Sequence, residues 1–470
     1  MKLRLLFRNL TRRKKLILWI CFGFVVPWLY PAWILWRGPL PIRISRETTF
    51  LTEPVHASGY VDYSFQANRC LLDGVPEGAT LDPAAVVSAF QSLQGALPRF
   101  NRGATDVGIT LSVEQERQLE DFIELLKDNN GVLTFDPIPD QLPYFNSFFG
   151  PDMDLMSNVI IGMEQLLPAA LKAQWLHHVK QGNTDEAMLR IDALISVQEF
   201  VLRQGAGLGS LFATEIETDL LTDCAELLAE GQLSTESCQQ ILQRLPVVSH
   251  HELHKQLELQ RLWKLSCFNA VHSRSMPLDV LTFASPSYVE RLASRLLSRW
   301  VVAHADWNRV CEDINLSFDQ AELELAEIFG GAVITGQPLT GVKPQFTRES
   351  NLWLSQQNAT DDLIFWSRLN DPGIGFAYEM CRCQRKREVL NAATFMLDYK
   401  AANGSWPESL TQAGFNDLSR ISKEGPAFSE DLTVTFGDVV DEFQLTIGTG
   451  GDSVILEYQQ SEAGPALSYR

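Results

Sequence analysis

The longest apolar stretch of the chain lies near its amino terminus, at residues 16–36 (LILWICFGFVVPWLYPAWILW), and contains no charged side chain. A helix of this length spans roughly 30 Å, the thickness of a bilayer's hydrocarbon core. Aromatic residues crowd the carboxyl-terminal end of the stretch, as is typical of the headgroup layer. The pattern predicts a transmembrane anchor, in which Pro27 and Pro31 kink the outer half or end the regular helix early.

A cleaved secretory signal is the alternative for these residues, but its apolar region has about 7–15 residues and ends in small side chains. The stretch here is longer and ends in aromatic residues followed by Arg37, which favours a retained anchor. Residues 1–15 hold seven Lys or Arg and no acidic residue. Because basic residues favour the cytoplasmic side, we expect the amino terminus in the cytoplasm and the bulk of the chain in a periplasmic or other extracytoplasmic space.

Apolar residues recur at helical spacing from about residue 80 to 330. Ser112 and Gln115 have the spacing of a capping box, and a single apolar stripe follows them. Further on, long periodic stretches alternate with brief breaks, at Gly182-Asn183, 205–209, Gly231 and Pro246. Short connections make neighbouring helices antiparallel. The pattern predicts helical hairpins in a non-repeating bundle or a loose solenoid, since the recurrence of about 34 residues that defines tetratricopeptide arrays is missing from the sequence.

Two elements beside these hairpins are less regular. Residues 59–65 alternate as a strand would. Ser285-Pro286, a cap followed by proline, predicts the start of a helix that runs through Cys311, and Gly330-Gly331 ends the helical region.

The carboxyl-terminal region combines one long helix with strands. The periodicity predicts a helix over about 374–402, and Asn403-Gly404 supplies a left-handed cap. Three strand-like runs follow, at residues 432–436, 442–447 and 453–458, and the last two form a predicted hairpin. We therefore expect a small α+β module with an antiparallel sheet.

The sequence thus predicts a mainly α protein with an anchor and a small α+β module. The expected organisation is a basic cytoplasmic tail at 1–15, a transmembrane anchor at 16–36, a tether and short strand at 37–79, a helical domain at 80–330, a loop-rich connector at 331–373, and the α+β module at 374–470.

Charge is unevenly divided along the chain. The whole chain carries −19, and because the first 36 residues contribute +7, the remainder carries −26. A surface of this sign repels nucleic acid and anionic lipid headgroups, so we expect neither as a partner of the exterior part.

Two cysteines are placed so that they could meet. Cys224 lies seven residues before Gly231 and Cys238 seven after it, so an antiparallel hairpin that turns near Gly231 brings them to similar height. In an oxidising compartment they could form a disulfide if their Cα atoms lie within about 7 Å. The alternative is two free thiols that pack as small apolar side chains.

The segment Ser249-His250-His251-Glu252-Leu253-His254 is the strongest candidate for chemistry. On a helix, His250 and His254 project from one face and could bind a divalent metal such as zinc, with a distant carboxylate as third ligand. The spacing differs from the HExxH zinc motif, because Glu252 comes two residues after His250. The structural alternative is a helix start, with Ser249 as the cap and Glu252 as its capping-box partner.

Residues 397–410 (LDYKAANGSWPESL) resemble the helix-to-sheet junction of type II secretion pseudopilins, and the resemblance covers about 390–460. It implies a long helix that leads through an Asn-Gly-x-aromatic-Pro segment into a small antiparallel sheet. The segment lies at the opposite end of the chain from a pseudopilin's anchor. Taken whole, the chain is also similar to uncharacterised bacterial families of single-pass envelope proteins, with Thr48-Thr49-Phe50-Leu51 shortly after the anchor.

These patterns favour a membrane-anchored envelope protein with a structural or protein-interaction role, a protein partner and no cofactor. A concave helical surface and an exposed sheet edge are the expected docking places. The alternative is a metal-dependent hydrolase that uses His250 and His254.

Overall fold

The computed structural model describes much of the chain from residue 40 onward. The predicted tail at 1–15, anchor at 16–36 and connector at 331–373 lie outside the described residues. Among the helices that are described, none has the length and apolar character needed to span a bilayer. The described residues are 40–55, 59–73, 80–81, 88–90, 92–93, 112–128, 132–133, 153–204, 208–246, 250–273, 306–329, 374–416, 419–421, 431–436, 442–448, 453–461 and 464–469.

The chain forms two compact units. Unit 1 comprises Met1–Val61, Cys267–Asn315 and Glu349–Asn370, and unit 2 comprises Asp62–Ser266, Leu316–Arg348 and Asp371–Arg470. The division differs from the predicted boundary between a helical domain at 80–330 and an α+β module at 374–470. One hydrophobic core includes buried residues of both regions, because the sheet packs directly on the helices.

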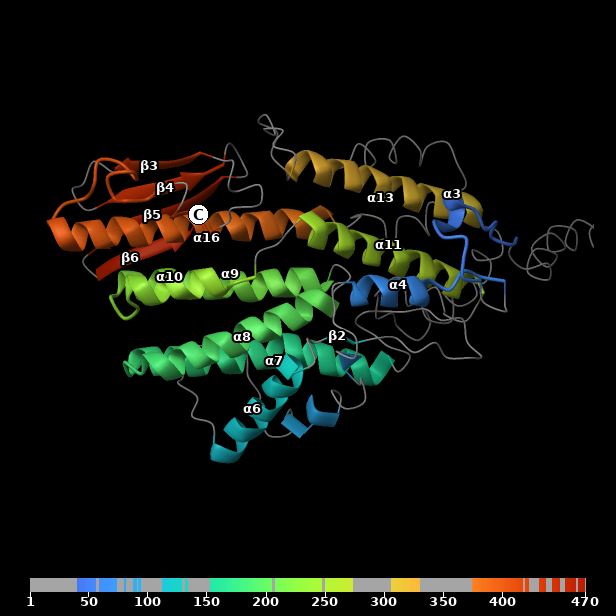
Figure 1. The fold of residues 1–470 in the computed structure, drawn as a ribbon, viewed down its shortest axis with the longest axis horizontal. Coiled ribbons are helices and arrows are strands. Elements are labelled where there is room, and N and C mark those ends of the chain that lie inside the picture. Colours follow the sequence, from blue (N-terminus) through green and yellow to red (C-terminus); the bar gives the residue numbers. More distant parts are fainter. Residues whose placement is uncertain are drawn as a thin grey trace, which may run out of the picture. The chain divides into compact units, whose positions relative to one another are not determined.

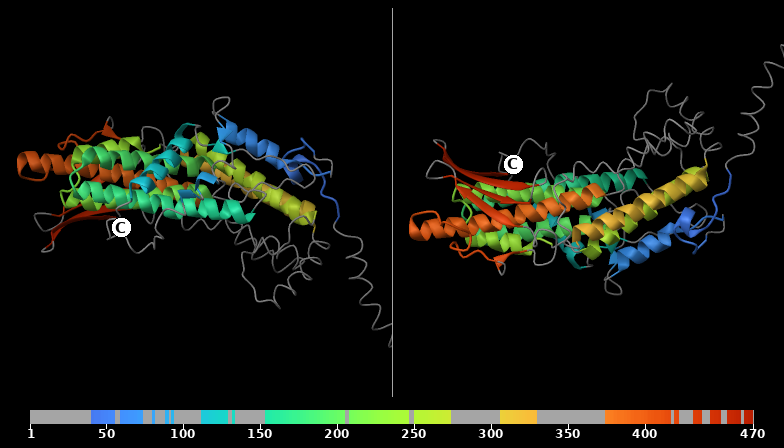
Figure 2. Two further views of the ribbon diagram at one scale, coloured as in Figure 1. Left: turned by 90° about the horizontal axis from the view of Figure 1, so that it is seen from below. Right: turned by 90° about the horizontal axis from the view of Figure 1, so that it is seen from above.

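Helices of unit 2 form the predicted hairpins. The breaks at Gly182 and Gly231 are confirmed, and both glycines have positive φ, 72° and 70°, which suits a residue without a Cβ. Successive helices α7, α8 and α9 pack against one another, and Figure 2 shows the long helices lying roughly along one direction. The bounds are α7 (Met153–Lys180), α8 (Thr184–Gln204), α9 (Leu208–Ala229), α10 (Thr235–Arg244) and α11 (His250–His272).

Helix α6 (Val113–Asp128) confirms the predicted capping box. The Ser112 backbone N–H donates to Gln115 Oε1 over 2.8 Å, and the Gln115 N–H donates to Ser112 Oγ over 3.3 Å. The apolar stripe is buried and the helix packs on α8. Local capping and periodicity were sufficient to predict this element.

Helix α16 (Ile374–Asn403) ends as predicted, with Gly404 at a φ of 74°. It contacts the α9–α10 hairpin and strands β4 and β5 of the sheet (Figure 1).

The sheet is fully antiparallel in the order β3-β4-β5-β6. Its strands are β3 (Leu432–Phe436), β4 (Phe443–Ile447), β5 (Val454–Ser461) and β6 (Gly464–Tyr469). Strand β6 was not predicted, because its Gly464-Pro465 start does not resemble a strand; proline is tolerated there since β6 lies at a sheet edge.

Two predictions were wrong. The strand expected at 59–65 is interrupted by helix α4 (Tyr63–Leu72), at whose start the Phe65 N–H donates to Asp62 Oδ1 over 3.4 Å. The helix expected to run through Cys311 is interrupted at Asp306, and helix α13 (Trp307–Phe329) begins after it. The expected start at Ser285-Pro286 lies outside the described residues. Asp306 accepts from the Arg309 N–H over 3.3 Å, as an N-terminal cap does, and its non-helical conformation separates α13 from the preceding residues.

The described structure also contains short elements near the amino terminus. Helix α3 (Arg46–Thr49) starts at Ser45, whose side chain caps it, and β1 (Thr80–Leu81) pairs in parallel with β2 (Val132–Leu133).

A buried carboxylate links α7 to α9. Lys172 Nζ lies 2.8 Å from Asp223 Oδ2. Burial raises the pKa of Asp223 to about 6 although Lys172 acts to lower it. An acid whose folded-state pKa is raised binds its proton more tightly in the folded protein. Its contribution to stability is therefore fully present below about pH 3.8 and is lost as the pH rises through about 6.

We expect Asp223→Asn to remove this pH dependence. Relative to the parent, the variant should gain on the order of 1–3 kcal/mol of unfolding free energy between pH 4 and pH 7.5. Denaturant unfolding of the full chain in detergent at both pH values measures the difference. Asp219→Asn is the control, because Asp219 lies 3.9 Å from the same ammonium but is exposed. If the unfolding free energies of the two variants depended equally on pH, the assignment of this pH dependence to Asp223 would be contradicted.

Candidate functional site

The middle of α16 carries the sequence RCQRKRE, residues 382–388, whose charges would suit a solvated surface. In the structure most of it is interior. Arg387 and Glu388 are both 0% exposed, and Arg385 is also buried. The cause is the position of α16, which is covered by helices on one side and by the sheet on another. Charged groups placed there must find partners within the protein.

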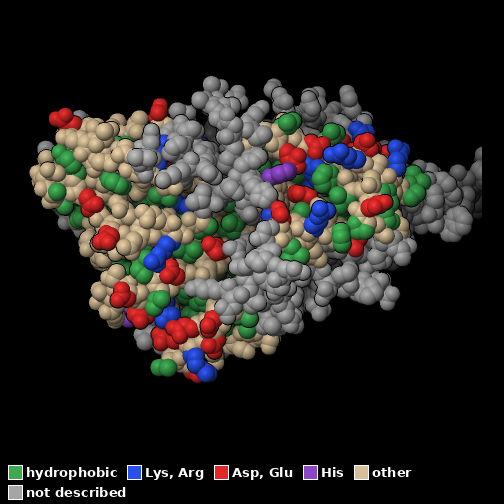
Figure 3. Space-filling view, in the orientation of Figure 1, with side chains coloured by type: hydrophobic (Ala, Val, Ile, Leu, Met, Phe, Trp, Pro, Cys, Tyr) green, Lys and Arg blue, Asp and Glu red, His purple; other side chains and the backbone are tan. Residues whose placement is uncertain are grey.

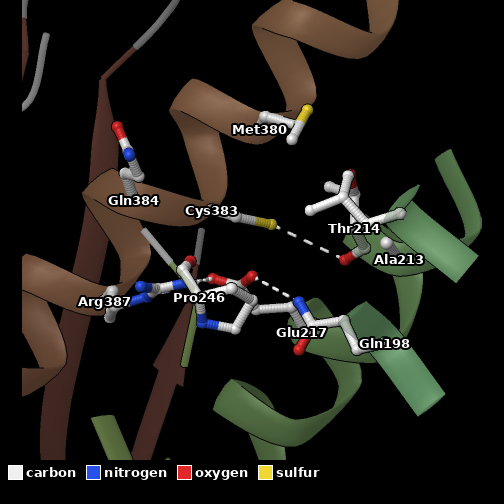
Figure 4. Close-up of a pocket in the computed structure, with 10 residues that line it drawn as sticks. Gln198, Ala213, Thr214, Glu217, Pro246, Met380, Cys383, Gln384 and Arg387 are labelled. Atoms are coloured by element: carbon white, nitrogen blue, oxygen red, sulfur yellow. Dashed lines mark hydrogen bonds and ion pairs between the residues drawn. The ribbon is translucent and has the colours of Figure 1, made fainter. Parts of the chain in front are cut away.

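Arg387 finds its partner on α9. Its Nη2 and Nε lie 2.6 Å and 3.1 Å from Glu217 Oε1, and Gln198 of α8 donates to Glu217 Oε2 over 2.8 Å. Two further guanidinium N–H groups donate to backbone carbonyls just after α10, Leu245 O at 3.3 Å and Pro246 O at 3.1 Å. Four segments thus meet at one buried ion pair (Figure 4).

The cavity beside this ion pair is too small for a substrate. It encloses about 10 Å³, room for about one water molecule. Figure 4 shows the Cys383 side chain directed toward α9, where its Sγ lies 3.6 Å from Thr214 O. Burial raises the pKa of Cys383 to about 12, so it stays a thiol at neutral pH and is a poor nucleophile. The arrangement holds helices α8, α9 and α16 together.

The predicted metal site is only partly visible. The His250 side chain lies outside the described part. His254 is about half exposed on α11, and its Nδ1 lies 4.0 Å from Glu322 Oε1 of α13. That carboxylate oxygen is also 3.3 Å from Arg261. Among the described residues, no cluster of three His, Cys, Asp or Glu could hold a metal ion. The metal hypothesis stays a prediction.

The two predicted cysteines do come together. Cys224 and Cys238 are both 0% exposed, and both are free thiols in this structure. A hydrogen bond between the two side chains, together with burial, raises the pKa of Cys224 well above its ordinary value. Helical hairpin geometry predicted that the two residues lie at similar height, and the disulfide between them stays a prediction.

Unit 1 contains a second polar arrangement, which the sequence did not indicate. His272, at the end of α11, has its Nε2 2.7 Å from Leu40 O and its Nδ1 2.6 Å from the Tyr60 hydroxyl. Because a carbonyl only accepts, Nε2 carries a proton, and Nδ1 forms a second hydrogen bond with the Tyr60 hydroxyl. Burial raises the pKa of Tyr60, which keeps this hydroxyl a donor. Trp307 packs edge-on against the His272 ring.

Asparagines of α11 and α13 bind the same amino-terminal segment. Asn308 accepts from the Arg43 N–H over 2.6 Å, and Asn315 donates to Glu47 O over 2.8 Å. Asn269 donates to Val61 O over 3.5 Å. We call these contacts, with that of His272 to Leu40, the clamp. The clamp means that the described part of the predicted tether at 37–79 is bound to helices and is not a free linker.

No family model, curated protein or solved structure matches this chain. The pseudopilin resemblance therefore stays a prediction. The observed order of long helix, Gly404, Trp406, Pro407 and antiparallel sheet agrees with the junction that the resemblance implies. At this junction Lys400 Nζ lies 4.1 Å from the Trp406 ring centroid, and Trp406 packs on Phe443 and Tyr458.

The ion pair should be costly to break on one side only. Arg387→Met or Glu217→Met leaves one buried charge unpaired, and each should lower the unfolding free energy by about 3–5 kcal/mol. The double variant buries two apolar side chains instead and should lose far less than the sum of the two. Chemical denaturation measures all three.

Arg382→Met is the matched control on the same helix. Arg382 is about half exposed and lies 3.9 Å from Glu379, so its loss should cost less than about 1 kcal/mol. Additive losses for Glu217 and Arg387, or an Arg387→Met cost no larger than that of Arg382→Met, would show that the pair is not the constraint described.

Proposed function

We propose that this chain is a single-pass envelope protein that docks another protein on the side of the membrane away from its basic tail. The clamp is the observation that supports this most. It binds Leu40 O to His272, and only residues 37–39 separate Leu40 from the end of the predicted anchor. Three extended residues span at most about 11 Å. Unit 1 is therefore mounted at the bilayer surface and does not reach out on a long tether.

The edge strand β3 supports docking by strand addition. It lies at one edge of the described sheet, its sequence LTVTF contains no charge or proline, and Phe436 is 42% exposed. Edge strands in proteins are usually protected by charge, proline or a bulge, and unprotected ones accept an extended segment of a partner.

Charge selects the class of partner. The chain beyond the anchor carries −26, and all five charged residues in the segment 430–442, which contains β3, are acidic. On the face in Figure 3, basic side chains of the described residues lie among acidic ones over α6 and over α11 and α13. The net negative charge and the acidic residues beside β3 disfavour a second copy of the chain at this edge and favour an extended basic segment of another envelope protein.

The alternative, a zinc-dependent hydrolase at His250 and His254, has less support. The carboxylate nearest to His254 is shared with Arg261, which competes with a metal for the same oxygen.

A photo-crosslinking residue in place of Thr435 tests the docking proposal in intact membranes. Thr435 is exposed on β3, and Glu124, exposed on α6, is the control position. We expect a covalent adduct with a basic membrane or envelope protein at 435 and not at 124, with a yield that falls as salt is raised. Equal capture at both positions, capture of an acidic partner, or no adduct at 435 would contradict the proposal.

A further inference from the structure

The turn between α9 and α10 fixes two thiols against each other. Gly231 has a φ of 70°, and the Gln232 N–H donates to Leu227 O over 2.9 Å, which closes α9. Ser234 caps α10 by accepting from the Ser237 N–H over 3.1 Å. Both ends of the connection are therefore determined locally, and positions equally distant from Gly231 face each other.

Cys224 and Cys238 occupy such positions, and their side chains are in contact in the core. Cys383, by comparison, has oxygen partners, with Thr218 Oγ1 at 3.1 Å and Thr214 O at 3.6 Å. The cysteine pair thus differs from Cys383, because the side chain of Cys224 interacts with that of Cys238 through a hydrogen bond.

We propose that Cys224 and Cys238 are oxidised to a disulfide that joins α9 to α10. The proposal rests on the extracytoplasmic location proposed above, since that compartment supplies an oxidant. The oxidant is the disulfide of a thiol–disulfide oxidoreductase. One cysteine attacks it as a thiolate to give a mixed disulfide, and the other displaces the enzyme. The chain loses two protons and two electrons, and the enzyme leaves as its dithiol.

The oxidation takes place during folding. In the folded protein both sulfurs are fully buried, so an enzyme can reach them only before α16 and the sheet cover the hairpin. A helical hairpin with a short turn forms early and locally, which presents the two thiols to the oxidant together.

The proposed disulfide joins the two helices, α9 and α10, that carry or precede the groups that bind Arg387. Helix α9 carries Glu217, and the carbonyls of Leu245 and Pro246 follow α10 directly. Helix α10 also holds α16 through its side chains: Thr235 Oγ1 lies 2.6 Å from Asp398 Oδ1, and Gln239 donates to Thr394 Oγ1 over 2.8 Å. A covalent link between α9 and α10 fixes the distance between the groups that bind Arg387, which are Glu217 on α9 and the carbonyls just after α10.

Differential alkylation of the full chain tests the bridge. Membranes are denatured in N-ethylmaleimide, reduced, and treated with iodoacetamide before peptide mass spectrometry. Cys224 and Cys238 should carry only the second label, while Cys311 and Cys383, which are equally buried, should carry the first. The first label on Cys224 and Cys238 would overturn the proposal. A topology reporter after Arg470 decides the location separately, so a bridge could be found even if the proposed location failed.

Thermal unfolding gives a second readout. If the bridge exists, Cys224→Ala and Cys238→Ala each break it, so both should lower the unfolding midpoint equally. The double variant, and the reduced parent, should then fall no further. If the two residues are separate thiols, the losses of the single variants add in the double variant, and the proposal is wrong.

Discussion

The structure of unit 2 depends on the cost of burying charge on α16. A guanidinium and a carboxylate removed from water are stable only when their partners are supplied with good geometry. Arg387 donates to the Glu217 carboxylate on α9 and to a backbone carbonyl just after α10. Gln198 of α8 donates to the second oxygen of Glu217. Because these partners come from three other segments, α16 can occupy only one register among the hairpins.

The sheet completes the enclosure of the same helix. The Tyr469 hydroxyl of β6 donates to Lys386 O over 3.0 Å, and Asn391 donates to Ser419 O over 2.8 Å. Apolar residues of β4 and β5 belong to the core cluster that also contains α7, α8 and α9. The carboxyl-terminal sheet is therefore part of one helical core and not an appended module.

Local signals predicted much of this fold. The glycines themselves indicated the turns at Gly182, Gly231 and Gly404, and each has positive φ in the structure. A capping box indicated the start of α6. The features that were missed depend on distant residues. Strand alternation around Tyr63 was overridden by a helix capped at Asp62, and β6 starts with a proline that only an edge position tolerates.

The cysteine pair, the buried ion pair and the clamp divide in the same way, into features that local sequence indicates and features that depend on distant residues. The facing cysteines followed from counting residues around one turn. In contrast, the arginines of α16 look solvated in the sequence, because nothing local identifies a buried partner 170 positions away. The clamp was equally hidden, since its asparagines bind backbone groups, which have no sequence signal. His250 and His254 illustrate the converse, in which a local pattern suggests a site for which the described residues supply no set of three ligands.

The central proposal is that the clamp holds unit 1 at the bilayer surface. The most direct test is quenching of a fluorophore at the exposed position Asp306 by spin-labelled lipid headgroups, with the full chain in vesicles. The account predicts strong quenching that falls when His272→Ala and Asn315→Ala release the amino-terminal segment. A fluorophore that is not quenched in the parent chain, or is quenched equally after the clamp is removed, would contradict it.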